Sequence, residues 1–149
     1  MHYLLTGSYS GPEEKGIKLW RFDSAAGKLT EEEGLAGVDR PSFLAIHPNG
    51  SSFAAASETG NGELVACLCN PIDGEFVEIN RQPSNGDHPA HVTIAESGSW
   101  LLAVNYSGGN VNVYPLSPEG EIGGLADSVR HEGTGPNRDR QDAAHPHSV

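Results

Sequence analysis

The sequence has few basic residues and no long apolar run. Nine Lys and Arg residues stand against 20 Asp and Glu, which gives a formal net charge of −11 with neutral histidines. A surface of that charge repels nucleic acid and anionic lipid at long range. No apolar run approaches the ~20 residues that a membrane-spanning helix needs. We therefore expect neither nucleic acid nor a membrane as a partner.

Cysteine is equally scarce, with only Cys67 and Cys69 in the chain. Residues at i and i+2 of a strand point in parallel from one face, which does not suit a relaxed disulfide. We expect two small buried side chains in a reducing compartment, with a two-thiol metal or redox site as the alternative. The first residues also lack the basic and long apolar segments of a secretory signal. Together these features predict a cytoplasmic protein.

Helical periodicity is missing as well. No window of 11 residues places apolar side chains at i, i+3, i+4 and i+7 between helix caps. What the chain does contain is 19 Gly and 10 Pro, the residues that form turns. Short alternating apolar runs separated by such turns predict an all-β fold.

One stretch of the sequence occurs twice. Residues 40–50 recur as residues 88–98, and Pro41 maps to Pro89 with an offset of 48 (89 − 41). A third copy begins at His145. Self-similarity at a period of ~40–50 residues, with several short strands per unit, is typical of β-propeller blades. Each such unit buries its apolar faces only against its neighbours.

Each unit is expected to hold four antiparallel strands joined by short turns. The expected strands of the two complete units are 41–47, 52–57, 63–69 and 76–80, then 89–95, 99–105, 110–116 and 122–125. The N-terminal segment fits the template only from its second strand onwards. The sequence thus predicts about three blades of a propeller, the first without its innermost strand. The expected boundaries are about 1–39, 40–87 and 88–128, with a long loop and the start of a fourth blade over 129–149.

Blade geometry predicts that distant polar residues meet on one rim. The start of each inner strand and the end of each second strand lie on the same face of a propeller. Equivalent positions at the ends of the second strands hold Tyr9, Glu58 and Tyr106, and the starts of the inner strands hold Ser42, His91 and His147. The long loop adds Arg138, Arg140 and Gln141 and leads into His145. Such a set is suited to binding an anionic, hydroxyl-rich ligand and moving protons.

Each of these residues also has a purely structural interpretation. Glu58 is equally consistent with a solvated loop carboxylate, and His91 with a hydrogen-bonded channel residue. His145 and His147 would share one face of a strand, as zinc ligands do, but no third ligand is evident. Arg138 and Arg140 would brace the loop against nearby carboxylates. His47, in a turn on the opposite face, is expected to be exposed.

Several motifs resemble one family. They are Leu5-Thr-Gly-Ser-Tyr-Ser, Lys15-Gly-Ile, His47-Pro-Asn-Gly50, Ala103-Val-Asn-Tyr-Ser-Gly-Gly109, residues 131–141 and Ala144-His-Pro-His-Ser148. Together they resemble the bacterial seven-bladed propeller lactonases, the 6-phosphogluconolactonase group, which is also similar to fungal carboxy-muconate cyclase. The resemblance covers essentially the whole chain, and its last segment is the most specific part.

The resemblance implies hydrolysis of a sugar lactone, with 6-phosphogluconolactone of the oxidative pentose phosphate route as the reference substrate. It implies no metal and no organic cofactor. In this interpretation His147 or Glu58 acts as the base, and Arg138 and Arg140 bind phosphate. The residues that bind or position the rest of the substrate would be Asn105, Tyr106, His91, Gln141 and His145. Family members run to roughly twice this length, so the missing blades would have to complete the ring, and residues 1–149 alone are expected to be inactive.

Two other functions remain open. A propeller of this kind is also suited to presenting its rim as a non-catalytic platform for a protein or small ligand, because the fold does not decide the function. The other alternative is a metal-dependent lactonase, which would need a set of carboxylates on the channel axis. The orientation of Glu58, His147 and the two arginines discriminates between the first two functions.

Overall fold

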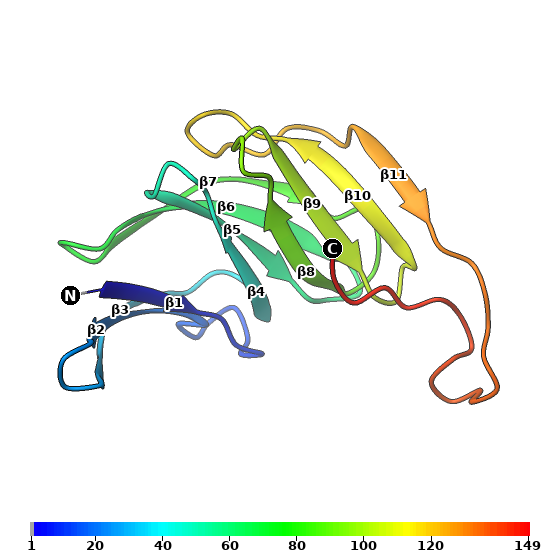
Figure 1. The fold of residues 1–149 in the computed structure, drawn as a ribbon, viewed down its shortest axis with the longest axis horizontal. Coiled ribbons are helices and arrows are strands. Elements are labelled where there is room, and N and C mark those ends of the chain that lie inside the picture. Colours follow the sequence, from blue (N-terminus) through cyan, green and yellow to red (C-terminus); the bar gives the residue numbers. More distant parts are fainter. Residues whose placement is uncertain (1) are drawn as a thin grey trace.

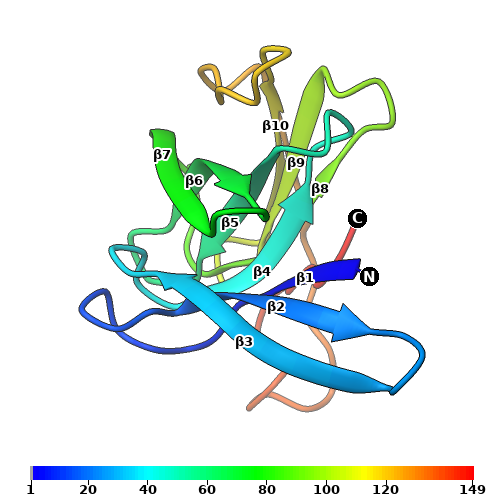
Figure 2. The same cartoon turned by 90° about the vertical axis from the view of Figure 1, so that its left-hand side faces the viewer.

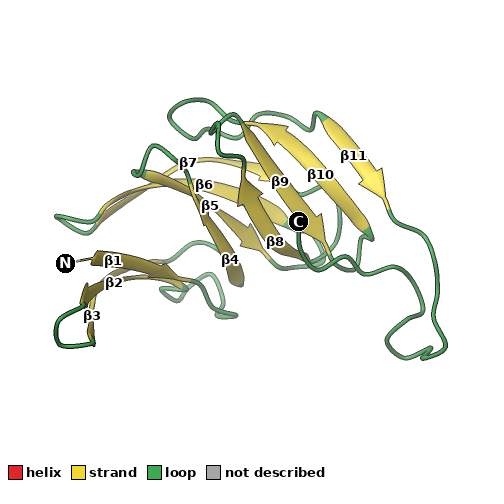
Figure 3. Ribbon diagram, viewed as in Figure 1, coloured by secondary structure: helices red, strands yellow, loops and turns green. Residues whose placement is uncertain are grey.

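The computed structural model describes residues 2–149, and these form eleven strands in three antiparallel sheets. The first sheet contains β1 (His2–Thr6), β2 (Ile17–Asp23) and β3 (Lys28–Leu35). The second contains β4 (Pro41–Ile46), β5 (Ser52–Ser57), β6 (Glu63–Asn70) and β7 (Glu75–Pro83). The third contains β8 (Pro89–Ile94), β9 (Trp100–Asn105), β10 (Asn110–Pro115) and β11 (Asp127–Arg130). The predicted all-β fold is confirmed, and only strands and loops appear in the ribbon (Figure 3).

The sheets stand side by side like the blades of a fan (Figures 1 and 2). Strand order in the second and third sheets follows the sequence, so each is a meander of hairpins. Strands β4 and β8, the first of their sheets, lie next to each other along the inner side. In the described residues the first sheet has no strand on the inner side of β1, as the template predicted. Three neighbouring blades of a propeller result.

The middle sheet is buried on both faces, and strict alternation sorts its side chains between them. Ala54 and Ala56 of β5 face the third sheet, while Phe53 and Ala55 face the first. The interface with the third sheet also contains Leu64, Ala66, Val92, Leu101, Ala103, Tyr114 and Ile122. The interface with the first also contains Ile17, Leu19, Val38, Val65, Cys67 and Cys69. Successive side chains of a strand point to opposite faces, so one apolar run supplies two interfaces.

Both cysteines lie in the interface between the first and second sheets. They are unpaired and buried, as expected from their i, i+2 spacing on β6. Burial raises the pKa of the Cys67 thiol to about 12, because a thiolate has no solvation there. The two side chains therefore serve as small hydrophobic groups.

The expectation that His47 is exposed is wrong. Its side chain is only 5% exposed, and it fastens the second sheet to the third. Its Nδ1 accepts the amide proton of Asn49 (3.1 Å), so the proton sits on Nε2, which donates to the carbonyl of Gly98 (2.8 Å). Gly98 has φ +72°, and a Cβ there would lie 2.9 Å from the imidazole. The turns of two successive repeats thus form one clasp.

The last strand of the third sheet also differs from its prediction. It was expected over 122–125, but Asp127–Arg130 forms β11 instead. The backbone of Ile122 is bound by the neighbouring sheet: its N–H donates to Oδ1 of Asn80 (3.0 Å) and its carbonyl accepts from Nδ2 (2.8 Å). With its side chain in the core and its backbone paired to an amide side chain, Ile122 makes only an isolated bridge, to Leu116.

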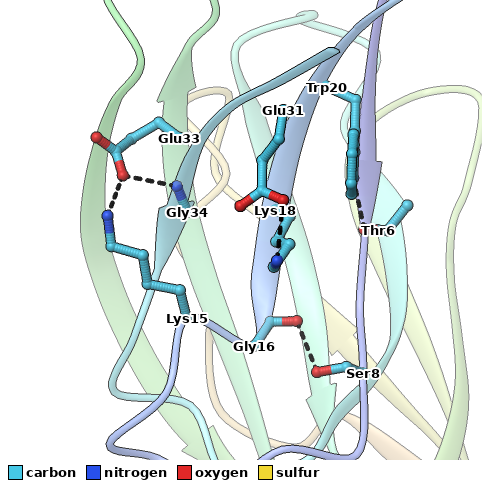
Figure 4. A network of polar contacts seen from close by, with 9 residues as sticks. All are labelled: Thr6, Ser8, Lys15, Gly16, Lys18, Trp20, Glu31, Glu33 and Gly34. Atoms are coloured by element: carbon cyan, nitrogen blue, oxygen red, sulfur yellow. Dashed lines mark hydrogen bonds and ion pairs between the residues drawn. The ribbon is translucent and has the colours of Figure 1, made fainter. Parts of the chain in front are cut away.

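The outer face of the first sheet carries a polar network (Figure 4). Nε1 of Trp20 donates to Oγ1 of Thr6 (2.9 Å), and Nζ of Lys18 pairs with Glu31 (3.0 Å). Lys15 pairs with Glu33 in the same region. On β2, Lys18 and Trp20 alternate with the buried Ile17 and Leu19, so this sheet has a polar outer face and an apolar inner face.

Within residues 2–149, no helix is long and apolar enough to cross a membrane.

Replacing His47 by alanine is expected to destabilise the fold. Its loss leaves the Gly98 carbonyl and the Asn49 amide without their imidazole partner, which costs about 1–3 kcal/mol. Urea unfolding followed by circular dichroism measures the change. His131→Ala, at an exposed histidine, is the matched control, and equal stability of the two variants would contradict the clasp.

Candidate functional site

A hollow of about 470 Å³ opens on the rim where the three sheets meet the C-terminal segment. This volume falls in the ~300–1,000 Å³ range of small-molecule sites. Its lining comes from every part of the chain: Tyr9, Ser42, Phe43, Glu58, Ala90, Tyr106, Arg140 and His147. The predicted convergence of Tyr9, Glu58 and Tyr106 at one mouth is therefore observed. All three occupy the position that follows, or nearly follows, the second strand of a blade.

A backbone turn that recurs in two blades positions the residues of this rim. Arg40 and His88, each before the proline of an inner strand, adopt left-handed φ values of 46° and 55°. Such values are uncommon outside glycine. The carbonyl of Arg40 accepts the amide proton of Glu58 (3.0 Å), and that of His88 accepts the amide proton of Tyr106 (2.9 Å). The same turn thus presents a different side chain in each copy.

Next to this turn, both inner strands begin with an irregularity of register. It falls between Pro41 and Phe43 in β4, and between Pro89 and His91 in β8. The residues at these breaks, Ser42 and Ala90, line the hollow. A bulge of this kind redirects a side chain at the end of a strand.

His91 does not line the hollow, although its counterpart Phe43 does. Its ring packs against Phe43, its counterpart in the previous copy, with centroids 4.3 Å apart. Partial burial lowers the pKa of His91, which favours the neutral imidazole. The ring of His91 thus extends from β8 to pack against β4.

Tyr9 and Glu58 form a pair across the first and second blades. The Tyr9 hydroxyl donates to Oε2 of Glu58 at 2.8 Å, although the Tyr9 side chain is 69% exposed. The hydrogen bond to this carboxylate raises the pKa of Tyr9, with desolvation adding to the effect. Oε1 of Glu58 has no hydrogen-bond partner among residues 2–149. One carboxylate oxygen is thus fixed while the other is available.

The C-terminal segment leaves β11 and returns toward β8 and β9 (Figure 1). Two of its histidines pack against the ring of Tyr106. His145 stacks on its ring (centroids 4.6 Å apart, planes at 16°) and His147 meets it edge-on (4.8 Å, 64°). Only His147 lines the hollow. Both ring nitrogens of His145 are engaged by the protein, with the carbonyl of Tyr106 (3.0 Å) and with Oδ1 of Asp142 (3.1 Å).

The long loop contributes one arginine to the hollow. Both arginines are exposed, but Arg140 lines the hollow and Arg138 does not. Gln141 closes the loop, because its Oε1 accepts the amide proton of Asn137 (3.1 Å) and its carbonyl accepts that of Gly135 (2.8 Å). Gln141 holds Arg140 in place and is not itself in the hollow.

Asn105 is fully buried and also lies outside the hollow. Its Nδ2 donates to the carbonyl of Ser84 (3.0 Å), which ties the connection between β7 and β8 to β9. The structure therefore assembles Glu58, Tyr106, Arg140 and His147 of the predicted site. It leaves Asn105, His91, Arg138, Gln141 and His145 around the hollow or beneath it.

Phe43 and Ala90 are lining residues that the sequence did not single out. The offset of 48 could have indicated both residues. Ala90 is the counterpart of Ser42, and Phe43 is the counterpart of His91. Across residues 2–149, no group of three or more His, Cys, Asp or Glu side chains is placed to hold a metal ion.

Comparison with known proteins agrees with the fold. The sequence model of the family described as "Lactonase, 7-bladed beta-propeller" matches residues 3–149. A 6-phosphogluconolactonase of Bacillus subtilis is 27% identical over 95% of this chain and 40% of its own length. A 6-phosphogluconolactonase of Formosa agariphila is 26% identical over 97% of the chain and 42% of its own length. The structure of the periplasmic gluconolactonase of Pseudomonas aeruginosa superimposes with a TM-score of 0.87 and 28% identity, over 99% of this chain and 43% of that one. The chain thus spans about 40% of the length of the curated relatives it matches.

Glu58→Gln is expected to lower the pKa of Tyr9 toward its ordinary value of 10.0. A neutral amide accepts the hydroxyl proton more weakly and does not repel the phenolate. NMR of the tyrosine ring carbons between pH 8 and pH 12, with Tyr9→Phe for assignment, measures the shift. Glu96→Gln, at an exposed turn, is the control, and an unchanged Tyr9 titration in Glu58→Gln would argue against the pair.

Proposed function

The chain belongs to the lactonase family of seven-bladed β-propellers, and from that premise we propose that a complete ring containing it hydrolyses a sugar lactone, 6-phosphogluconolactone. The observation that supports the proposal is the hollow, where a carboxylate, an imidazole and a guanidinium lie on one rim. Lactone hydrolysis needs a group that takes a proton from water and positive charge beside the substrate. Two relatives that cover this chain carry the name 6-phosphogluconolactonase.

Two groups in the hollow are suited to be the base. Glu58 has one oxygen held by Tyr9 and the other without a partner, so it is fixed in direction and able to accept a proton from water. Among residues 2–149, the ring contact with Tyr106 is what holds His147. Water loses a proton as its oxygen attacks the lactone carbonyl carbon, and the ring oxygen gains a proton as the acyl–oxygen bond breaks. We assign the first proton transfer to Glu58 or His147.

Arg140 is the residue that we assign to the phosphate of the substrate. Its side chain lines the hollow, and a guanidinium binds phosphate oxygens through paired N–H donors. Arg138 lies two residues away and does not line the hollow. In this proposal Arg138 contributes less to phosphate binding than the sequence suggested, and Tyr106 positions His147.

The remaining features of the proposal concern the setting of the site. The ring needs further blades beyond the three described here, and residues 1–149 alone are expected to hydrolyse lactones at background rate. We propose chemistry by side chains and water without a metal or organic cofactor. We also propose a cytoplasmic location, supported by two buried thiols in the reduced form.

Among the alternatives, the orientation of the rim residues favours hydrolysis over a non-catalytic platform. Glu58, Arg140 and His147 all face the hollow, which is the arrangement that a reacting small molecule needs. A platform would not require a carboxylate and an imidazole beside the same concave surface.

Arg140→Gln in the complete ring is expected to raise KM for 6-phosphogluconolactone by about 10–100-fold, because one charge-assisted phosphate contact is lost. KM for unphosphorylated gluconolactone should hardly change. A coupled assay with 6-phosphogluconate dehydrogenase and a pH-stat measure the two reactions. Arg138→Gln is the matched control, and equal effects of both variants on both lactones would exclude the assignment.

Replacement of the base is expected to lower kcat by about 10²–10⁴-fold. Glu58→Gln and His147→Gln, assayed from pH 5 to pH 9, identify which group it is. Replacement of the true base removes the acidic limb of the pH profile, whereas replacement of the other residue keeps it. Glu96→Gln is again the control for a remote carboxylate. Full activity in both rim variants would sink the proposed chemistry.

A further inference from the structure

Tyr106 is the attachment point of the C-terminal segment, which we define as residues 132–149. Within the described residues, every hydrogen bond or ring contact that joins this segment to the sheets involves Tyr106. The segment's other hydrogen bonds are internal, such as those that close the loop at Gln141. The attachment therefore depends on a small number of interactions, and His145 makes two of them.

The partners of His145 fix its protonation state. A carbonyl oxygen and a carboxylate oxygen both accept hydrogen bonds and cannot donate them. Nδ1 faces the carbonyl of Tyr106 at 3.0 Å, and Nε2 faces Oδ1 of Asp142 at 3.1 Å. Both nitrogens must carry a proton for the two hydrogen bonds to exist together. The geometry is therefore that of an imidazolium, stacked on the ring of Tyr106 at 4.6 Å, where a cation is also favoured.

A neutral imidazole cannot keep both contacts. If the proton stays on Nδ1, the lone pair of Nε2 faces the carboxylate of Asp142. If it stays on Nε2, the lone pair of Nδ1 faces the carbonyl of Tyr106, and the hydrogen bond to the sheets is lost. Deprotonation thus weakens either the brace within the segment or its attachment to Tyr106.

We propose that His145 is a positioning residue, a positively charged latch that fastens the C-terminal segment to Tyr106 and so holds Arg140 and His147 in the hollow. It is not a substrate ligand, because both of its ring nitrogens are already used by the protein. The attachment stands on the contacts alone, and its effect on a lactone rests on the proposed function.

The charged and titratable groups around His145 set the direction of its pH dependence. Asp142 and the carbonyl of Tyr106 favour the imidazolium, whereas Arg140 opposes it, and the net effect is a pKa above the ordinary 6.5. His147 shares the Tyr106 ring but not these hydrogen bonds. The stabilisation is fully present below pH 6.5 and is lost as the pH rises through the higher pKa of the attached state. The segment is therefore attached in acid and loosens in alkali.

NMR of the purified protein tests the protonation state directly. In long-range proton–nitrogen spectra, His145 should show two protonated nitrogens at pH 6 and titrate above 6.5. Asp142→Asn should lower its midpoint, because the hydrogen bond to a charged carboxylate is removed. Asp139→Asn, in the same loop without a contact to His145, is the control. A single protonated nitrogen at pH 6, or the same midpoint in Asp142→Asn and wild type, would overturn the proposal.

Limited proteolysis tests the attachment. Trypsin cleaves after Arg138 and Arg140, and at pH 7.5 cleavage should be about tenfold faster in His145→Gln and Asp142→Asn than in wild type or Asp139→Asn. Equal rates in all four proteins would show that His145 does not hold the segment. Neither experiment uses a lactone. A charged, attached His145 in a complete ring without lactonase activity would refute the proposed function and leave the latch intact.

Discussion

Burial of the apolar faces that neighbouring sheets share is the constraint on which this structure depends. A four-stranded sheet with two apolar faces has no stable isolated form, so its neighbours must cover both. The middle sheet shows how closely the sequence meets this demand, since adjacent alanines of β5 belong to different interfaces. Small side chains there let the sheets approach, while Phe53 and Leu64 fill the wider spaces. The order of the blades follows directly, and with it the meeting of the rims.

The rim adds a second layer of order, because its backbone geometry is repeated while its side chains are not. Arg40 and His88 share an unusual conformation that holds the next rim residue through a backbone hydrogen bond. The position held in this way is Glu58 in one copy and Tyr106 in the next. One becomes a partner for Tyr9, and the other a support for two histidines. Identical turns therefore deliver different chemistry to a common hollow.

The sequence predicted those features that depend on the alternation of side chains along a strand and on the offset between repeats. Alternation placed Cys67 and Cys69 together in a core, and the offset of 48 placed Glu58 beside Tyr106. It failed where contacts between sheets or breaks in register decide. The ring of His91 packs against Phe43 of the neighbouring sheet and does not line the hollow, and the side-chain amide of Asn80 pairs with the backbone of Ile122, which forms only an isolated bridge. The burial of His47 was not predicted, because its hydrogen-bond partner, Gly98, belongs to the next repeat. A periodic pattern contains no information about such partners.

The clasp at His47 has a consequence for mechanical coupling between blades. It joins a turn of the second blade to the same turn of the third, on the face away from the hollow, and at the opposite end the N–H of His88 donates to the carbonyl of Thr59 in the second blade (2.8 Å). The second and third blades are therefore fixed to each other at both ends as well as along their flat sides. Rocking of a blade about its long axis is resisted, so a ligand at the mouth meets walls of constant spacing. Adaptation to its shape is left to the parts of the rim outside the sheets, such as the loop that contains Tyr9 and the segment that contains Arg140 and His147.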